Sequence, residues 1–420
     1  MPIICEISCW ICFCLKITDN FTGFEHQKNI QLLKNIVFAG LASLLLWNCK
    51  SPKAETLVSH KDTVQVPDPP PPALSEEEIQ HFHNAVDNEL NHTLFRTRFN
   101  GAILIAKNGI VVYEKYIGFT DPRGRDSIKP GTPFQIASTS KTLTSAAVLQ
   151  LIQEGRLSLQ DKVTKFFPAF PYTEVTVKML LDHRSGLPNY LYYVDKYTWD
   201  KHKEMSNADV LNSLINWHPT QAYRPGIHFN YCNTNFVLLA LIVEKVSGQT
   251  FPVYMKQHIF DPLGMKNTFV HYLGDSAKVI QSFQPSGRMW ALDFSDGPYG
   301  DKNVYSTPED LLKWDQSLYG AKILNRQMLD SAFTPYSNER PGIKNYGLGW
   351  RMLILPNKKK VIYHNGHWHG FNSAFARLTD EKATIIILSN RFNSSVYTTA
   401  KKLYNLFGNY DGKHEDNGEE

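Results

Sequence analysis

The most informative stretch of this 420-residue sequence is the decapeptide Thr132-Pro133-Phe134-Gln135-Ile136-Ala137-Ser138-Thr139-Ser140-Lys141. Residues 133–137 have the pattern of an extended segment, and we expect an amphipathic helix to follow over 141–154 and to end at Gly155. Ser138 and Lys141 then lie one helical turn apart on the same face. The sequence therefore predicts a serine hydroxyl beside a lysine amine at the N-terminus of a helix.

This pairing has a chemical interpretation and a purely structural alternative. A serine hydroxyl is a poor nucleophile until a base takes its proton, and a lysine can be that base when desolvation or nearby positive charge favours its neutral form. The helix N-terminus adds positive potential, which also favours a developing oxyanion. Composition alone predicts about one Ser-x-x-Lys in a chain of this length, so a helix cap followed by a surface lysine is the alternative.

Two further elements could complete such a site. The tripeptide Tyr231-Cys232-Asn233 follows the turn Pro225-Gly226 and precedes an apolar helix. A phenol beside a lysine can shuttle protons, and an asparagine amide can orient both the lysine and a substrate carbonyl. The second element is His364-Asn365-Gly366, at the end of an apolar strand, where glycine lets a substrate backbone lie alongside and the next N–H can help to form an oxyanion hole.

The order of the elements predicts an α+β fold. A hairpin is expected over 102–106 and 110–116, because Asn108-Gly109 between two β-rich runs is a strong turn signal. Four more strands are expected near the other end, over 350–355, 361–364, 373–378 and 383–389. The middle of the chain is mainly helical. We expect the strands from both ends to pair in one antiparallel sheet flanked by helices, with a mostly helical lobe beside it.

Composition narrows the functional classes. Hydrophobic residues make up 42% of the chain and charged residues 20%, close to the averages of soluble globular proteins. The formal net charge of +4 comes without a basic patch, so no nucleic-acid partner is expected. The common sequence signatures of α/β-hydrolases, phosphate-binding loops, dinucleotide-binding folds and zincins are missing, and no cofactor is expected. Cys232 is the one cysteine of the main body, which therefore holds no internal disulfide.

The N-terminal region is interpreted as a leader over residues 1–48. Its apolar run, 36–47, is too short to span a bilayer as a helix and fits a secretory signal. The Cys-rich first part, up to about residue 30, does not fit that signal. It indicates a mis-assigned translation start, with a metal knuckle as the alternative. Cys49 is a candidate for lipidation, with plain cleavage or a buried segment as alternatives. The expected location is the periplasm or cell envelope, with possible membrane anchoring through a lipid on Cys49.

A Pro-rich tether is expected over 49–74, because a run of prolines forms a stiff, extended spacer. The folded domain is expected over 75–410 and opens with a helix capped by Ser75. Residues 411–420 form a polar tail.

The three elements, in this order and with their flanks, resemble the serine β-lactamase and D,D-peptidase superfamily. The resemblance is to the branch that contains class C β-lactamases, D-alanyl-D-alanine carboxypeptidases, D-aminopeptidases and related esterases. It covers about residues 80–408 and includes the stretches 132–138, 180–188, 225–235, 305–311 and 346–350. The implied fold is that of this superfamily.

The resemblance also implies roles for individual residues. Ser138 would be the acylated nucleophile, Lys141 and Tyr231 would exchange its proton, and Asn233 would position lysine and substrate. His364 stands where class C β-lactamases carry a lysine. The oxyanion hole and substrate-binding edge would be formed by the backbone at Ser138, Gly366 and His367.

The implied function is that of an exported serine hydrolase that acts on an amide or ester through an acyl-enzyme. Its substrate would be a D-peptide, a simple ester or a β-lactam, and cell-wall peptide is one such partner. His364, together with bulky Trp368 and His369, departs from the β-lactamase pattern and leaves β-lactam turnover and substrate range open. The sequence also leaves open the oligomeric state and the choice between hydrolysis and acyl transfer.

Two alternatives remain at this point. His364, His367 and His369 lie within six residues, which allows a metallohydrolase with a histidine cluster. The chain could also be a catalytically silent envelope binding protein that kept the fold, although each expected reactive position is filled.

Overall fold

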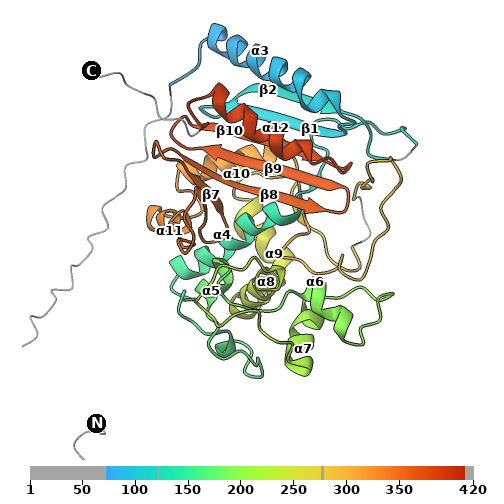
Figure 1. Ribbon diagram of the computed structural model, residues 1–420, viewed down its shortest axis with the longest axis vertical. Coiled ribbons are helices and arrows are strands. Elements are labelled where there is room, and N and C mark those ends of the chain that lie inside the picture. Colours follow the sequence, from blue (N-terminus) through green and yellow to red (C-terminus); the bar gives the residue numbers. More distant parts are fainter. Residues whose placement is uncertain (1–71, 122, 276–278, 412–420) are drawn as a thin grey trace, which may run out of the picture. The chain divides into compact units, whose positions relative to one another are not determined.

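The computed structural model describes residues 72–121, 123–275 and 279–411 (Figure 1). The leader, Cys49 and nearly all of the tether lie outside the described residues, and the predicted domain boundaries stay predictions. Among the described residues, no single helix is long and apolar enough to cross a membrane. One pair of helices, bent by 79° and formed by Asn233–Ser247 and Phe251–Phe260, passes that test of length and composition only as a pair.

A seven-stranded antiparallel sheet, in the order β2-β1-β10-β9-β8-β7-β6, organises the domain. Strand β1 pairs with β10 from Gly101↔Ser389 to Lys107↔Ala383, so the two ends of the domain meet in the middle of the sheet. This arrangement confirms the predicted α+β fold. The strands are β1 (Gly101–Lys107), β2 (Ile110–Ile117), β6 (Lys344–Tyr346), β7 (Arg351–Ile354), β8 (Lys360–Trp368), β9 (Phe371–Leu378) and β10 (Ala383–Ser389).

Helices cover both faces of this sheet, because its central strands are apolar on both sides. Ile103 and Ile105 of β1 pack with α3 (Glu76–His92) and α12 (Ser395–Leu403). Ala102 and Leu104, which alternate with them, belong to the larger core formed with the helical lobe. In Figure 1, α12 lies over β9 and β10, and α3 lies beyond it near β2. The Ser75 capping box predicted at the start of α3 is present.

The helical lobe is built around α4 (Ser140–Gln153) and α8 (Asn233–Ser247), which pack against each other (Figure 1). Gly248 ends α8 with a φ of 76°, in the left-handed region that glycine adopts readily. A small sheet joins β3 (Phe134–Gln135), β5 (Val304–Ser306) and β4 (Phe269–Val270). The other helices of four residues or more are α5 (Val177–Leu181), α6 (Tyr190–Tyr193), α7 (Asn207–Trp217), α9 (Phe251–Met255), the π-helical turn Lys256–Phe260, α10 (Pro308–Tyr319) and α11 (Arg326–Ala332).

One buried ion pair ties the helical layer to the sheet. Arg377 of β9 donates through Nε to Asp315 of α10 at 2.5 Å, and both side chains are almost fully buried. Thr384 of β10 donates to the other carboxylate oxygen at 2.6 Å. A buried charge without its partner is strongly destabilising, so these bonds specify how α10 sits on the sheet.

Candidate active site

Ser138 lies in a short 3₁₀ turn, η2 (Ala137–Thr139), immediately before α4. The residue before it, Ala137, has a φ of 47°, a conformation that L-residues other than asparagine and aspartate rarely adopt. Lys141 Nζ lies 3.2 Å from Ser138 Oγ. Lys141 is fully buried, so the alternative of a surface lysine is wrong.

Two other acceptors hold the Lys141 amine. Its Nζ donates to Asn233 Oδ1 at 2.8 Å and to the carbonyl oxygen of Asp301 at 2.7 Å. With Ser138 Oγ, these two acceptors fix the position of the amine. The sequence pattern contained Asn233 but no signal for Asp301, because a backbone carbonyl carries no residue-specific information.

Tyr231 lies beside this lysine in the segment that enters α8. The centre of its ring is 5.0 Å from Lys141 Nζ and 4.8 Å from the guanidinium carbon of Arg351. The Tyr231 ring therefore contacts both the Lys141 amine and the Arg351 guanidinium, and sequence reasoning missed Arg351 entirely. Cys232 is buried, as expected for a small apolar side chain, and burial raises the pKa of its thiol to about 11.

His364 on β8 is fully buried beside the same cluster. Its Nδ1 lies 2.8 Å from the Asn365 carbonyl oxygen and its Nε2 lies 3.2 Å from the Tyr346 hydroxyl. Burial, with the nearby positive charges of Arg351 and Lys141, holds the pKa of His364 well below its usual range. The ring is therefore neutral, Nδ1 donates to the carbonyl, and Nε2 accepts from the tyrosine hydroxyl.

Gly366 brings β8 into contact with the Ser138 segment. A Cβ at this position would lie 2.2 Å from the carbonyl oxygen of Ile136 and 3.0 Å from the backbone nitrogen of Ser138, so only glycine fits. Thr139 Oγ1 donates to the His364 carbonyl oxygen at 3.2 Å and fastens η2 to the strand. The peptide that joins Gly366 to His367 thus lies next to Ser138. The oxyanion role of the His367 N–H stays a prediction.

His183 was not assigned a role from sequence, although it lies in the family-like stretch 180–188. Its Nδ1 accepts hydrogen bonds from the Cys232 backbone N–H at 3.2 Å and from Asn235 Nδ2 at 3.1 Å. Its ring centre lies 4.4 Å from that of Tyr231. This buried imidazole therefore fixes the backbone that carries Tyr231. Burial, together with the nearby Lys141 and Arg351 side chains, holds the pKa of His183 well below its usual range.

A pH dependence of stability follows from the two buried histidines. The pKa values of His183 and His364 are lowered in the folded protein, so the unfolded chain binds more protons below about pH 6.5. Their contribution to stability is fully present above that pH and is lost as the pH falls. Between about pH 5 and pH 6, we expect the free energy of unfolding of the wild type to rise with pH. In His364→Asn this slope should be smaller by about 1 kcal/mol per pH unit. Urea unfolding at several pH values measures this slope, and an unchanged slope would contradict the prediction.

The predicted histidine cluster does not form a metal site. His364 and His367 are separated by three positions along β8, which puts their side chains on opposite faces, one buried and the other exposed. His369 instead bonds through Nε2 to Asp296 at 3.0 Å. Among the described residues, the metal-ligating group that does come together is Asp293, Asp296 and His369. In this group, His369 and Asp296 hydrogen-bond to each other.

The comparison with protein families decides the assignment. The family model described as Beta-lactamase matches residues 86–408, about three quarters of the sequence. The chain belongs to the beta-lactamase family. It is therefore a serine hydrolase of the β-lactamase and D-alanyl-D-alanine carboxypeptidase type, as the resemblance implied.

Individual relatives of this beta-lactamase-family protein agree with the assignment. Penicillin-binding protein 4* from Bacillus subtilis (strain 168) is 32% identical over 329 residues, which are 73% of each chain. A penicillin-binding protein from Bacillus halodurans has the same fold, with a TM-score of 0.67 at 24% identity over 78% of this chain and 99% of that one. D-amino acid amidase from Ochrobactrum anthropi SV3 shares it with a TM-score of 0.62 at 21% identity over 77% and 98% of the two chains.

Proposed function

We propose that Ser138 is the nucleophile and that Lys141 and Tyr231 exchange its proton. The Oγ attacks the carbonyl carbon of an amide or ester, and its proton passes to the Lys141 amine or the Tyr231 oxygen. The C–N or C–O bond then breaks, and the departing amine or alcohol takes that proton. Water repeats the sequence in reverse, so Ser138 regains its proton and the acid is released. The observation that carries this proposal is the buried Lys141 amine, 3.2 Å from Ser138 Oγ.

The remaining site residues would support this chemistry. Asn233 orients the amine through its 2.8 Å bond. The backbone N–H groups of Ser138 and His367 would bind the carbonyl oxygen as it becomes an oxyanion. His364 is neutral, and it orients the Tyr346 hydroxyl without adding charge to the cleft.

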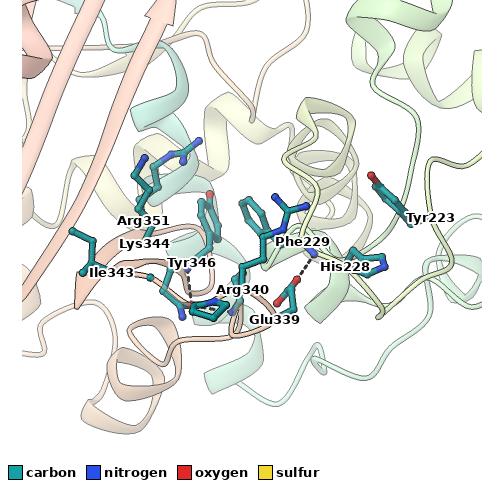
Figure 2. A pocket seen from close by; sticks show the side chains of 13 residues that line it. Tyr223, His228, Phe229, Glu339, Arg340, Ile343, Lys344, Tyr346 and Arg351 are labelled. Carbon is teal, nitrogen blue, oxygen red and sulfur yellow. Dashed lines mark hydrogen bonds between the residues drawn. The ribbon is translucent and has the colours of Figure 1, made fainter. Parts of the chain in front are cut away.

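The substrate class we propose is a D-peptide that ends in a carboxylate. A cavity of about 610 Å³ opens beside Tyr346 and Arg351 (Figure 2). Its cationic lining includes Arg340, Lys344 and Arg351. Its one acid, Glu339, is already paired with Arg184 at 3.0 Å. No carboxylate among the described residues pairs with Arg351, whose guanidinium lies over the rings of Tyr231 and Tyr346.

A pair of substrates tests this assignment. We expect Arg351→Met to raise KM about tenfold or more for an N-acetyl D-alanyl-D-alanine peptide, because a charge-assisted hydrogen bond is worth about 1.5–3 kcal/mol. The same peptide with a C-terminal carboxamide should be little affected, because it offers no carboxylate. Steady-state kinetics on both peptides give the two ratios. Equal effects on both substrates would contradict the role of Arg351, and the absence of any acyl-enzyme by intact mass would contradict the proposed mechanism.

The cellular setting follows from the N-terminal sequence and the names of the relatives. We propose an enzyme of the periplasm or cell envelope, anchored through a lipid on Cys49, with cell-wall peptide as its substrate. N-terminal sequencing of the native protein tests this, and Met1 on the mature chain would contradict it.

A further inference from the structure

His364 and Trp368 of β8 lie on opposite sides of Ser138. His364, Gly366 and Trp368 alternate along the strand and so face the same side. His364 contacts Tyr346, at the cationic cavity. Gly366 lies against the backbone of Ser138. Trp368 is therefore on the opposite side of the nucleophile from the cationic cavity.

The Trp368 side chain is held in place by polar and cationic contacts. Its Nε1 donates to Asp296 Oδ1 at 2.7 Å, and the Lys302 ammonium lies 4.6 Å from its ring centre. His369 Nε2 bonds to the same carboxylate. An indole fixed on both its edge and its face cannot swing away at low cost.

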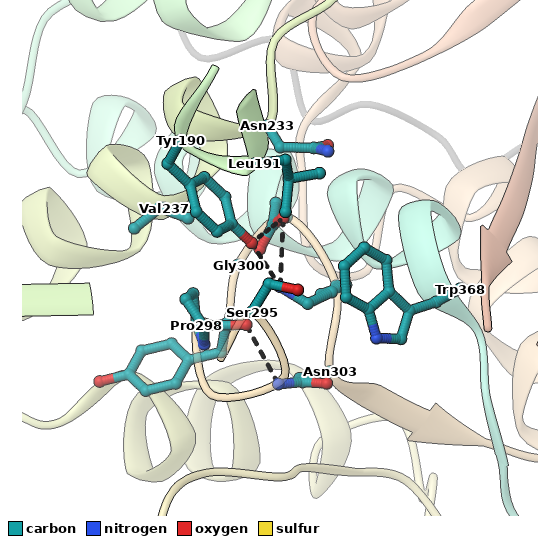
Figure 3. Close-up of polar contacts among 12 residues, drawn as sticks. Tyr190, Leu191, Asn233, Val237, Ser295, Pro298, Gly300, Asn303 and Trp368 are labelled. Carbon is teal, nitrogen blue, oxygen red and sulfur yellow. Dashed lines mark hydrogen bonds and ion pairs between the residues drawn. The ribbon is translucent and has the colours of Figure 1, made fainter. Parts of the chain in front are cut away.

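The anchor of this tryptophan belongs to the segment that also holds the Lys141 amine. Lys302 is buried and bonds to the Tyr190 hydroxyl, which donates to Asp301 Oδ2 at 3.1 Å. The carbonyl of the same Asp301 accepts from Lys141. Figure 3 shows Trp368 projecting toward the loop of Gly300, with Asn233 and Leu191 contributed by the helical lobe. Trp368 therefore contacts Lys302, the neighbour in sequence of Asp301, whose carbonyl oxygen accepts from the Lys141 amine.

We propose that Trp368 borders the acyl end of the cleft and restricts the enzyme to substrates whose reacting acyl residue carries a small side chain, of the size of glycyl or alanyl. This rests on the proposed function, in which the carboxylate of the leaving group lies near Arg351. When a substrate binds along β8 with its leaving-group carboxylate at Arg351, its acyl portion extends past Ser138 toward Trp368. A side chain much larger than methyl then meets the fixed indole.

A series of p-nitrophenyl esters tests the restriction directly. The wild type should prefer acetate to butyrate and hexanoate in kcat/KM. Trp368→Ala should raise the hexanoate-to-acetate ratio at least about tenfold, because a steric limit of one or two methylenes is worth about 10–200-fold. Trp368→Leu should give a smaller shift of this ratio in the same direction. It replaces the alanine variant as the test if the alanine variant does not fold. Trp368→Phe should stay close to the wild type.

The control is Trp217→Ala, which removes a partly buried tryptophan stacked on Tyr197 at the end of α7. It should leave the ester ratio unchanged. A ratio that stays at the wild-type value in the folded alanine and leucine variants would overturn the proposal while leaving the proposed function standing. A wild type that releases p-nitrophenolate from none of the esters, and forms no adduct, would overturn both.

Discussion

Ser138→Ala should abolish covalent labelling by a fluorescent penicillin or fluorophosphonate and should lower the turnover of ester and D-peptide substrates by roughly 10⁴–10⁶-fold. The physical reason is that the Lys141 amine has three hydrogen-bond acceptors, and only one of them, Ser138 Oγ at 3.2 Å, is a hydroxyl. Gel fluorescence and intact mass spectrometry of both proteins measure the effect.

The matched control is Ser140→Ala, two residues further along. Its hydroxyl accepts the Val304 backbone N–H at 3.2 Å and is not among the acceptors of the Lys141 amine, so labelling should persist. Thermal melting curves of both variants exclude unfolding as the cause. Equal labelling of the wild type and Ser138→Ala would remove Ser138 from the mechanism.

Lys141→Met should slow acylation by about 10³-fold, within the range that general acid–base groups contribute. Methionine keeps the unbranched shape and most of the length of the side chain but removes the amine, so Ser138 loses its proposed proton acceptor. Asn233 Oδ1 and the Asp301 carbonyl also lose their donor. Stopped-flow measurement of p-nitrophenolate release separates this step from deacylation.

Chemical rescue distinguishes a catalytic amine from a merely structural one. In Lys141→Ala the deleted side chain leaves space in a fully buried site, and added methylamine or ethylamine should restore part of the acylation rate. Rescue should depend on the fraction of free amine and therefore rise with pH. Acylation by Lys141→Met within threefold of the wild type would contradict a role for this lysine as base.

Much of the fold was predictable because its signals are local. The Asn108-Gly109 turn predicted the hairpin now seen as β1 and β2, and the alternating apolar runs predicted β7 to β10. Pairing of β1 with β10 needed one further assumption, that apolar strands from both ends must share a core. The extended segment predicted over 133–137 is shorter in the structure. It forms the two-residue strand β3, because the chain turns at Ala137 before it enters α4.

The histidine-cluster alternative shows where local patterns mislead. Close spacing in sequence suggested convergence of His364, His367 and His369. The period of two residues in a strand instead sends His364 and His367 to opposite faces, while the turn after β8 takes His369 to Asp296.

The sequence by itself predicted the contact between Ser138 and Lys141, because a spacing of three residues at the start of a helix puts both side chains on one face. It also singled out Gly366, although the structure extends the predicted strand 361–364 to Trp368 and alone shows that a Cβ at Gly366 would meet the Ile136 carbonyl oxygen. The tertiary structure alone decided which groups surround that pair. The Asp301 carbonyl comes from 160 positions away, and Arg351, His183 and the anchored Trp368 come from still other segments. Such contacts depend on how the sheet and the helical lobe pack together, and packing is set by the whole core rather than by the spacing of neighbouring residues.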